Sequence, residues 1–442
     1  MNAKRMTQWL IVLLLLAALP VMTVTLAQEE QPGKQLPSVT EPGESAVPQT
    51  YNVYESENNN TPAAADDIRL NDVMGGQMDQ HGDVDWFIMQ GSDSYYLIDI
   101  EAESIGSYMD PVVCVEQGWV EYCNDDTDTV DSLLFYNPNP SYAGPFHIKV
   151  SDFNGSGGWK HHYELIVSTP LLVSAAAGGL GTGYVAGIPF TAQDILAHSD
   201  LNTGDEKWVM FFDGSDVGIT KNLTNLAADW MDSNWDPNDN ILIGLAANQP
   251  IVLAPGWPNH DPANAVVGPY DILQFYPTQY GPETIGQFAI YMNGPGDLST
   301  AGEKIDAFDG FKGYGACYGD AVSTTGAASV PDYSFGYTVY AQDEDLLCRE
   351  YEDDDYTPAW WALGFDGSNA RGLKGEDVVA VATANRTFFL TILGSGKIHG
   401  HAVNQKDIFA INLPNYTWGG YMWRGSQHGW NYNIDAFEFN GG

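Results

Sequence analysis

The sequence predicts an all-β protein: a small β-sandwich or jelly-roll domain, followed by a repeat-built β domain that we expect to be a four-bladed β-propeller. Three observations favour this class. Short β-branched and aromatic runs alternate with Gly, Asn, Asp and Pro along most of the chain. Charged runs are few, although glycine and aromatic residues are plentiful. In the second half, a strand that ends in an Asp-Gly-type turn occurs four times, in weakened form after the first, which indicates an internal repeat.

Residues 1–27 predict a secretory signal peptide. Lys4 and Arg5 precede the apolar run Trp9–Leu19, and the small-residue exit Thr25–Ala27 follows. The run is short for a membrane helix, and no later stretch approaches roughly 18 apolar residues. We therefore expect a secreted or cell-surface protein with no membrane span after signal cleavage. An uncleaved N-terminal anchor is the alternative.

Residues 28–53 are rich in Pro, Gln, Glu and Ser and have no apolar period. This composition predicts a flexible tether. The alternative is an extended strand that this segment supplies to a neighbouring subunit, which would make the protein self-associate.

The chain is strongly acidic, with 58 Asp and Glu residues against 17 Lys and Arg residues and a net charge of −41. Such a charge repels nucleic acid and anionic lipid, so nucleic acid is not an expected partner. It suits a solvated exterior or the binding of divalent cations.

Four cysteines occur in two pairs that are close in sequence. In an exported chain, the simplest of the three possible pairings is Cys114–Cys123 with Cys317–Cys348. Free buried thiols are the alternative. Neither pair has the spacing of a zinc site or a Cys-x-x-Cys redox motif.

Residues 54–170 predict one small β domain. Its strand-like runs are separated by turn residues, as in a sandwich or jelly roll. The runs are Tyr95–Ile100, Pro111–Val115, Ser132–Tyr136, Phe146–Val150 and Tyr163–Val167.

Three segments of this domain carry a family resemblance. They are Glu57–Ala63 (E-N-N-N-T-P-A), Gly82–Phe87 (G-D-V-D-W-F) and the closing run Tyr163–Val167. In this order they resemble the bacterial pre-peptidase C-terminal domain, a family similar to the collagen-binding domain of bacterial collagenases. Asn58 departs from the family, where Pro is usual, and the cysteine pair is an addition.

The resemblance implies a calcium site. Some members of the family bind calcium through an acidic and amide-rich N-terminal segment and the Asp residues of the Asp-x-Asp strand. Calcium takes six to eight oxygen ligands, which clustered carboxylate and amide groups supply. The alternative is that these residues only form turns. Collagen binding is not implied, because the family's binding face is not recognisable here. The matching positions are Glu55, Glu57, Asn59, Asn60, Asp83 and Asp85.

Residues 171–442 predict the repeat domain, with a small-residue joint at Ser174–Leu180. Asp194, Asp271, Asp345 and Asp407 each precede or open a short strand. The next strand ends in a turn, best seen in Asp213-Gly214-Ser215-Asp216 and repeated as Asp366-Gly367-Ser368-Asn369. Asp accepts hydrogen bonds from nearby backbone, and Gly tolerates positive φ, so these residues favour turns. A cation held by the turn is the alternative.

We expect four units of about four strands, each unit beginning at one of the repeated Asp residues. The fourth unit lacks a strand, and Tyr184–Pro189 is the expected segment that completes it and closes the ring. A pair of β-sandwiches is the alternative. The domain resembles the D-G-S-D-V-G-L repeat regions of secreted bacterial proteins of unassigned function, and this resemblance implies no catalytic residues.

No stretch matches a common catalytic motif, and Gly394–Lys397 lacks the length of a phosphate-binding loop. His399 and His401 are a metal-binding alternative. Exposed aromatic residues would carry ligand binding, although core packing is the competing role. The tryptophans in question are Trp230, Trp235, Trp257, Trp360, Trp418 and Trp430.

The expected function is therefore non-enzymatic binding, adhesion or display outside the cell. The partner would be an extracellular glycan or matrix protein, and calcium would stabilise the sandwich. The alternatives are a structural subunit of an extracellular polymer and a polysaccharide hydrolase built on the propeller.

Overall fold

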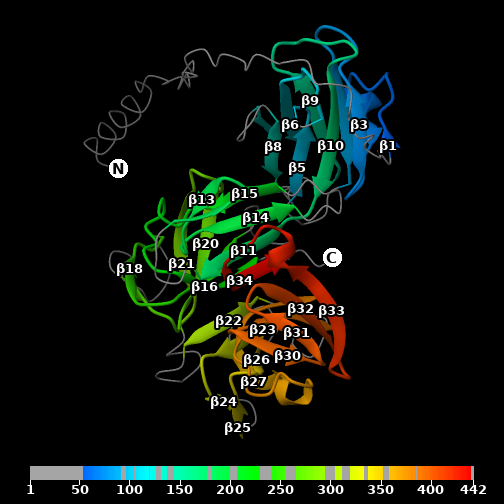
Figure 1. Cartoon of the computed structure of the whole chain (residues 1–442). Helices are drawn as coiled ribbons and strands as arrows, with labels where there is room; N and C mark the ends of the chain where they lie inside the picture. Colours follow the sequence, from blue (N-terminus) through cyan, green and yellow to red (C-terminus); the bar gives the residue numbers. More distant parts are fainter. Residues whose placement is uncertain are drawn as a thin grey trace, which may run out of the picture. The chain divides into compact units, whose positions relative to one another are not determined.

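The computed structural model describes residues 53–439 except 91–95, 104, 119, 126–130, 137–143, 177–181, 200–206, 229–239, 255–264, 294–303, 311–318, 333–336, 352–357 and 385. Within these residues every regular element is a β-strand or a short 3-10 turn (Figure 1). The all-β fold class is therefore confirmed. No helix in this part of the chain is long and apolar enough to cross a membrane. The expected signal peptide and all of the expected tether except Val53 lie outside the described residues.

Residues 53–168 form a β-sandwich of two five-stranded sheets, in the orders β1-β3-β10-β5-β8 and β2-β4-β9-β6-β7. Alternate residues of β9 are buried, as expected for a strand with one face on a core. That core combines Ile98 and Leu165 of the first sheet with Phe87 and Ile148 of the second. The strands are β1 (Val53–Tyr54), β2 (Asp66–Asp67), β3 (Val73–Gln77), β4 (Val84–Met89), β5 (Tyr96–Glu101), β6 (Pro111–Gln117), β7 (Val120–Asn124), β8 (Ser132–Tyr136), β9 (Phe146–Asp152) and β10 (His162–Ser168).

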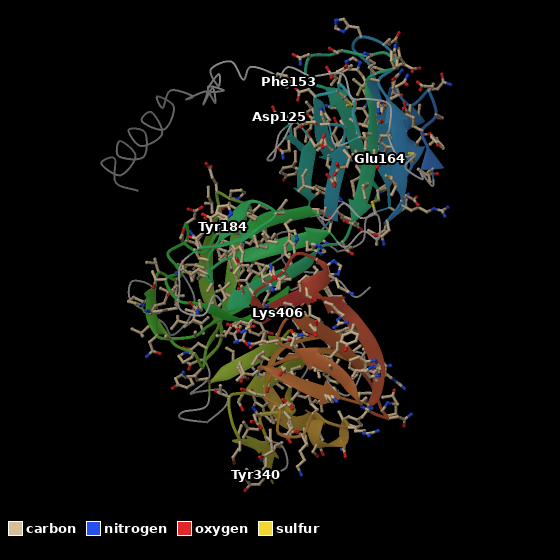
Figure 2. All side chains as sticks on the ribbon, in the orientation of Figure 1. Asp125, Phe153, Glu164, Tyr184, Tyr340 and Lys406 are labelled. Atoms are coloured by element: carbon tan, nitrogen blue, oxygen red, sulfur yellow. A yellow bond between two sulfur atoms is a disulfide. The ribbon has the colours of Figure 1, made fainter. Side chains whose placement is uncertain are left out.

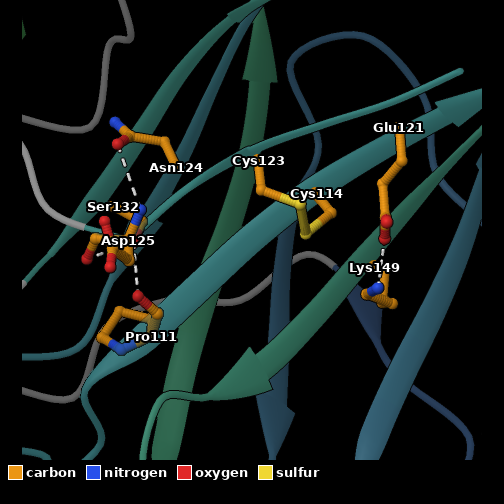
Figure 3. The surroundings of a disulfide bond; sticks show 8 residues. All are labelled: Pro111, Cys114, Glu121, Cys123, Asn124, Asp125, Ser132 and Lys149. Carbon is orange, nitrogen blue, oxygen red and sulfur yellow. Dashed lines mark hydrogen bonds and ion pairs between the residues drawn. A yellow bond between two sulfur atoms is a disulfide. The ribbon is translucent and has the colours of Figure 1, made fainter. Parts of the chain in front are cut away.

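One disulfide links neighbouring strands of the sandwich. Cys114 on β6 and Cys123 on β7 are paired across the strands, with their Cα atoms 4.0 Å apart (Figure 3). The expected Cys114–Cys123 bond is thus present. Cys348 is also disulfide-bonded, and its expected partner Cys317 lies outside the described residues.

The rest of the described chain forms four four-stranded sheets, which we number along the chain. They are the first sheet (β34-β11-β14-β15), the second (β16-β17-β20-β21), the third (β22-β23-β26-β27) and the fourth (β28-β29-β32-β33). Their strands are β11 (Leu171–Ala176), β14 (Ile195–Ser199), β15 (Lys207–Phe212), β16 (Leu223–Ala228), β17 (Ile241–Leu245), β20 (Ile272–Gln279), β21 (Ile285–Met292), β22 (Ile305–Asp309), β23 (Gly319–Thr324), β26 (Leu346–Tyr351), β27 (Pro358–Phe365), β28 (Val378–Ala384), β29 (Thr387–Ile392), β32 (Asp407–Asn412), β33 (Thr417–Arg424) and β34 (Asn433–Phe439).

The sheets divide the repeats differently from the sequence-based expectation. Each repeated Asp lies at the start of the third strand of a sheet (β14, β20, β26 and β32), so each expected unit is split between two sheets. The strand that pairs with β34 is β11, which includes Ser174–Ala176 of the expected joint. Tyr184–Pro189 does not take that place. A strand's own pattern does not identify its partner, which explains this error.

A two-stranded hairpin lies between the second and third strands of every sheet. Tyr184–Pro189, expected to close the ring, falls in the first hairpin. Tyr184 and Tyr340 are both exposed on these hairpins (Figure 2). The hairpin strands are β12 (Gly183–Val185), β13 (Ile188–Phe190), β18 (Gln249–Ile251), β19 (Ala265–Val267), β24 (Ala328–Asp332), β25 (Tyr337–Ala341), β30 (Ser395–Ile398) and β31 (His401–Asn404).

Hydrophobic clusters join each sheet to the next. Leu172 of the first sheet packs with Leu226 of the second, and Leu242 of the second packs with Phe308 of the third. A third cluster joins the third and fourth sheets. A fourth, which contains Phe437, joins the fourth sheet to the first. One edge strand of each sheet follows the same order: β34 of the first sheet, β16 of the second, β22 of the third and β28 of the fourth. Each of these strands contacts the next one, and β28 contacts β34 again.

Backbone hydrogen bonds repeat this order. The first residue of β16, Leu223, donates its N–H to Ala192 O of the turn before β14 (2.8 Å). The equivalent bonds run from the starts of β22, β28 and β34 to the corresponding turns of the second, third and fourth sheets. They are Ile305 N to Pro269 O (2.9 Å), Val378 N to Asp343 O (3.1 Å) and Ile434 N to Gln405 O (2.8 Å).

Candidate metal centre

Two carboxylates and a tyrosine hydroxyl meet inside the sandwich. Glu55 follows β1, Asp85 lies on β4 and Tyr163 lies on β10. The Tyr163 hydroxyl oxygen is 2.9 Å from Glu55 Oε2 and 2.8 Å from Asp85 Oδ2. Because a hydroxyl donates a single hydrogen, it satisfies only one of these carboxylates at a time. The second carboxylate needs a proton of its own or a cation.

A glycine makes room for this tyrosine. Gly76 on β3 pairs with Tyr163 across the sheet. A Cβ atom on Gly76 would lie 2.2 Å from Cζ of the Tyr163 ring. The tyrosine therefore reaches the carboxylates over a position where any side chain would collide with it.

Asn59 completes the buried part of the site. Its side chain is 1% exposed, and its Nδ2 lies 3.4 Å from both Glu55 Oε2 and Asp66 Oδ2. The backbone N–H of Gln77 donates to Glu55 Oε1. The amide side chain and the backbone thus hold Glu55 in place, and the Asn59 side-chain carbonyl adds an oxygen near the carboxylates.

The surroundings of the site disfavour the ionised forms of its carboxyl groups. Burial raises the pKa of Asp85 to about 9, and the nearby Glu55 carboxylate adds to the shift. Burial also raises the pKa of Glu55. Asp85 Oδ1 is buried without a hydrogen-bond partner among the described residues. Carboxylates that are buried together in this way either take up protons or bind a cation.

A second acidic group lies beside the first. Burial, an Asp79 hydrogen bond and the charge of Glu55 raise the pKa of Glu57 to about 7. Asp83 Oδ2 accepts the backbone N–H of Asp79 at 2.7 Å. Asn60 follows Asn59 at an exposed position. The structure therefore links Glu55 directly to Asn59, and to Asp85 through the Tyr163 hydroxyl. Glu57 and Asp83 lie close enough to affect the charge of this group.

Sequence reasoning missed two members of this site. Asp79 lies in the turn before β4, and only its spacing from Asp83 hints at a role. The family motif places Tyr163 on a closing strand and predicts no role for it at the site. It comes from the far end of the domain sequence, so only the pairing of β10 with β3 brings it here.

One other group in the described residues has three potential metal ligands close together. Cys114, Glu121 and Cys123 have ligand atoms within 4.8 Å of one another. The two sulfurs form the disulfide, so they are not the thiolates that bind metals. Glu121 forms an ion pair with Lys149 (Figure 3). The carboxylates around Glu55 do not form such a tight trio, so a cation there would also need amide, backbone or water oxygens.

The repeated Asp residues have a structural role in the described chain. Asp194 accepts the N–H of Thr191 (2.6 Å) with Oδ2 and the N–H of Gly214 (3.1 Å) with Oδ1. Asp345 makes the same pair of bonds in its own sheet. Its partners are Gln342 N and Gly367 N, both at 2.8 Å. Each Asp thus joins the turn before its strand to the Asp-Gly turn that follows the next strand.

Glycine is required in these turns because a backbone carbonyl of the preceding turn lies too close for a side chain. A Cβ on Gly214 would lie 2.3 Å from Gln193 O, and one on Gly367 would lie 2.1 Å from Glu344 O. The turn carboxylates bond within the turn: Asp213 Oδ1 accepts Ser215 N (2.9 Å). These bonds account for the turn residues without a cation.

The two histidines do not share a strand. His399 lies in the two-residue turn between β30 and β31 with φ 51°, and His401 begins β31. His401 stacks on the half-buried Trp418, with ring centroids 4.6 Å apart. Trp430 is a core residue. The other tryptophans named as candidates lie outside the described residues, or in the case of Trp360 outside the described side chains.

Exposed aromatic side chains gather on two adjoining loops of the sandwich. Trp159 is 77% exposed and Phe153 is 58% exposed. Tyr108 N donates to Lys160 O (2.9 Å), which holds the two loops together. Lys160 Nζ lies 4.6 Å from the Tyr108 ring centroid and 5.1 Å from that of Trp159. We call Tyr108, Phe153, Trp159 and Lys160 the aromatic patch; sequence reasoning did not identify it.

Comparison with known proteins yields one weak structural similarity. No family model matches the chain, and no curated protein matches it. Among solved structures, the chain is similar to the pre-peptidase C-terminal domain of collagenase from Bacillus anthracis. The identity is 17%, the match covers 25% of this chain and 99% of that one, and the TM-score is 0.19. This score is too low to support an argument about function, which therefore rests on the residues. The resemblance to D-G-S-D-V-G-L repeat regions stays a prediction.

Proposed function

We propose that this protein is a secreted, non-enzymatic binding protein that attaches to an extracellular glycan or matrix protein. The aromatic patch carries the proposal. Tyr and Trp supply large contact areas with little loss of side-chain entropy, and such residues dominate the binding energy of many interfaces. Lys160 holds its charge over two of the rings, and cation–π contacts of this kind orient exposed aromatic side chains.

A binding screen against glycans and matrix proteins tests this function. Trp159→Ala combined with Phe153→Ala should lower affinity at least tenfold for any ligand that the wild type binds. Tyr340→Ala removes an aromatic residue that is 70% exposed on a hairpin of the third sheet, and it is the matched control. Equal loss in both variants, or no loss in the double variant, would rule out the aromatic patch as the binding surface.

Calcium is the proposed ligand of the acidic site around Glu55 and Asp85. Calcium prefers hard oxygen donors, and a bound cation would compensate for the burial that raises both pKa values. EDTA should then lower the melting temperature of the sandwich, and Glu57→Ala should abolish the difference for this domain. Glu121→Gln, which alters an exposed carboxylate paired with Lys149, should leave the EDTA effect intact. A melting temperature that is insensitive to EDTA would exclude the site.

For the repeat domain we propose a closed four-bladed β-propeller. Three observations support it: the cyclic order of the hydrophobic clusters, the contacts of the edge strands and the four repeated backbone hydrogen bonds. In this arrangement β34 and β11 close the ring within the first sheet. Deletion of residues 433–442 should therefore unfold all four sheets together. Stepwise loss of the first sheet alone would contradict closure.

A further inference from the structure

Two carboxylates from different sheets meet at the inner edge of the repeat domain. Asp306 lies on β22, the edge strand of the third sheet, and Asp377 directly precedes β28, the edge strand of the fourth. These strands contact each other. The carboxyl groups are close enough for each to shift the pKa of the other.

Asp306 is buried without a donor. It is 8% exposed, and neither of its carboxylate oxygens has a hydrogen-bond partner among the described residues. Asp377 Oδ1 is also buried and has no hydrogen-bond partner among the described residues. Two carboxylates are both acceptors, so their contact is favourable only with a shared proton or a bound cation. An unpaired buried charge would otherwise cost several kcal/mol.

The surroundings add negative charge to this pair. Asp343 O accepts Val378 N at 3.1 Å, which places Asp343 next to Asp377 along the sheet contact. Burial raises the pKa of Asp306 well above its ordinary value, and Asp377 and Asp343 raise it further. Asp377 is half-buried, which leaves a route to solvent.

The four edge strands provide an internal comparison. Each has a register shift at the same place, and the residue at that bulge is Thr224, Asp306, Val379 or Asp435. Since Thr and Val occupy this position, the bulge itself does not require a carboxylate. Asp435 has a hydrogen bond from Gln405 Nε2 at 3.3 Å. Asp306 has no donor from another residue in the described chain, so the burial of its carboxyl group needs another explanation.

We propose that Asp306 and Asp377, with Asp343 beside them, bind a divalent cation, with calcium as the chemical type. Oxygen ligands from the two carboxylates, completed by backbone and water oxygens, suit a hard cation of this kind. Asp343 adds negative charge nearby, but in the described residues it does not form a trio with Asp306 and Asp377 whose ligand atoms all lie within 4.8 Å of one another. The ion would join the third and fourth sheets at their edge strands. This site is separate from the acidic site of the sandwich and does not depend on it.

The test counts bound calcium in the full chain by isothermal titration calorimetry and by metal analysis after dialysis. Asp85→Asn first removes the sandwich site. In this background one calcium ion per chain should remain, and adding Asp306→Asn should abolish it. Adding Asp435→Asn, the same change at the equivalent bulge, should leave the remaining ion bound. Asp377→Asn provides a second variant at the site.

Two results would overturn the proposal. One is that the Asp85→Asn protein binds no calcium, or keeps its ion when Asp306→Asn is added. The other is that Asp306→Asn raises the melting temperature equally with and without calcium, which indicates a shared proton. Circular dichroism establishes that each variant is folded. If only the sandwich site is absent, Asp85→Asn removes no ion, but Asp306→Asn still does. The two sites can therefore fail independently of each other in this test.

Discussion

Replacing Asp345 by alanine tests the structural role of the repeated Asp. Its carboxylate is 6% exposed and accepts two backbone N–H groups, from Gln342 and from Gly367, both at 2.8 Å. A charge-assisted hydrogen bond contributes about 1.5–3 kcal/mol, so the two together contribute about 3–6 kcal/mol. Burial raises the pKa of Asp345, so the desolvation of its carboxylate offsets part of the stabilisation from these hydrogen bonds. We expect a net loss of about 2–4 kcal/mol in the free energy of unfolding.

The assay is urea unfolding followed by tryptophan fluorescence and circular dichroism. Asp366→Ala is the matched control, because Asp366 accepts Ser368 N within a turn that is largely exposed. Loss of such a cap costs about 0.5–2 kcal/mol. Asp194→Ala should resemble Asp345→Ala, since it removes the same pair of bonds. If Asp345→Ala costs no more than Asp366→Ala, the buried carboxylate does not hold the repeat together.

Three further predictions follow from buried groups. Gly214→Ala should lower the free energy of unfolding by about 1–3 kcal/mol in urea titrations, because its Cβ would meet Gln193 O at 2.3 Å. Arg349→Ala should cost about 3–5 kcal/mol by the same measurement, since it leaves the buried Asp320 carboxylate, 3.5 Å from the guanidinium, without its cation. Burial raises the pKa of Asp435 from 3.8 to about 7. The folded state then holds a proton that the unfolded chain releases, so stability should fall with rising pH between about 4 and 7, by at most about 1.4 kcal/mol per pH unit. Other carboxyl groups with raised pKa values contribute to the same slope, so Asp435→Asn should make it shallower rather than abolish it. Melting temperatures across this range would show the difference, and an unchanged slope would exclude a contribution from Asp435.

The candidate site was partly predictable because most of its residues are local in sequence. Glu55 and Asn59 belong to one short segment, and Asp83 and Asp85 lie two residues apart at the start of β4, so the motifs of the family resemblance included them. Tyr163 was not predictable as a member. Its hydroxyl reaches Glu55 only because β10 pairs with β3 and because Gly76 leaves space for the ring.

The sequence alone determined the all-β class, most strand positions and the Asp-Gly turns of the second half. These depend on interactions between residues close in the chain: alternation of side chains, turn geometry and short-range hydrogen bonds. Only the tertiary structure decided which strands form one sheet. β11 pairs with β34 across almost the whole repeat region, and Asp306 meets Asp377 through the contact of two edge strands. A strand offers the same hydrogen bonds to any neighbour, so the choice depends on how whole sheets bury their apolar faces against one another.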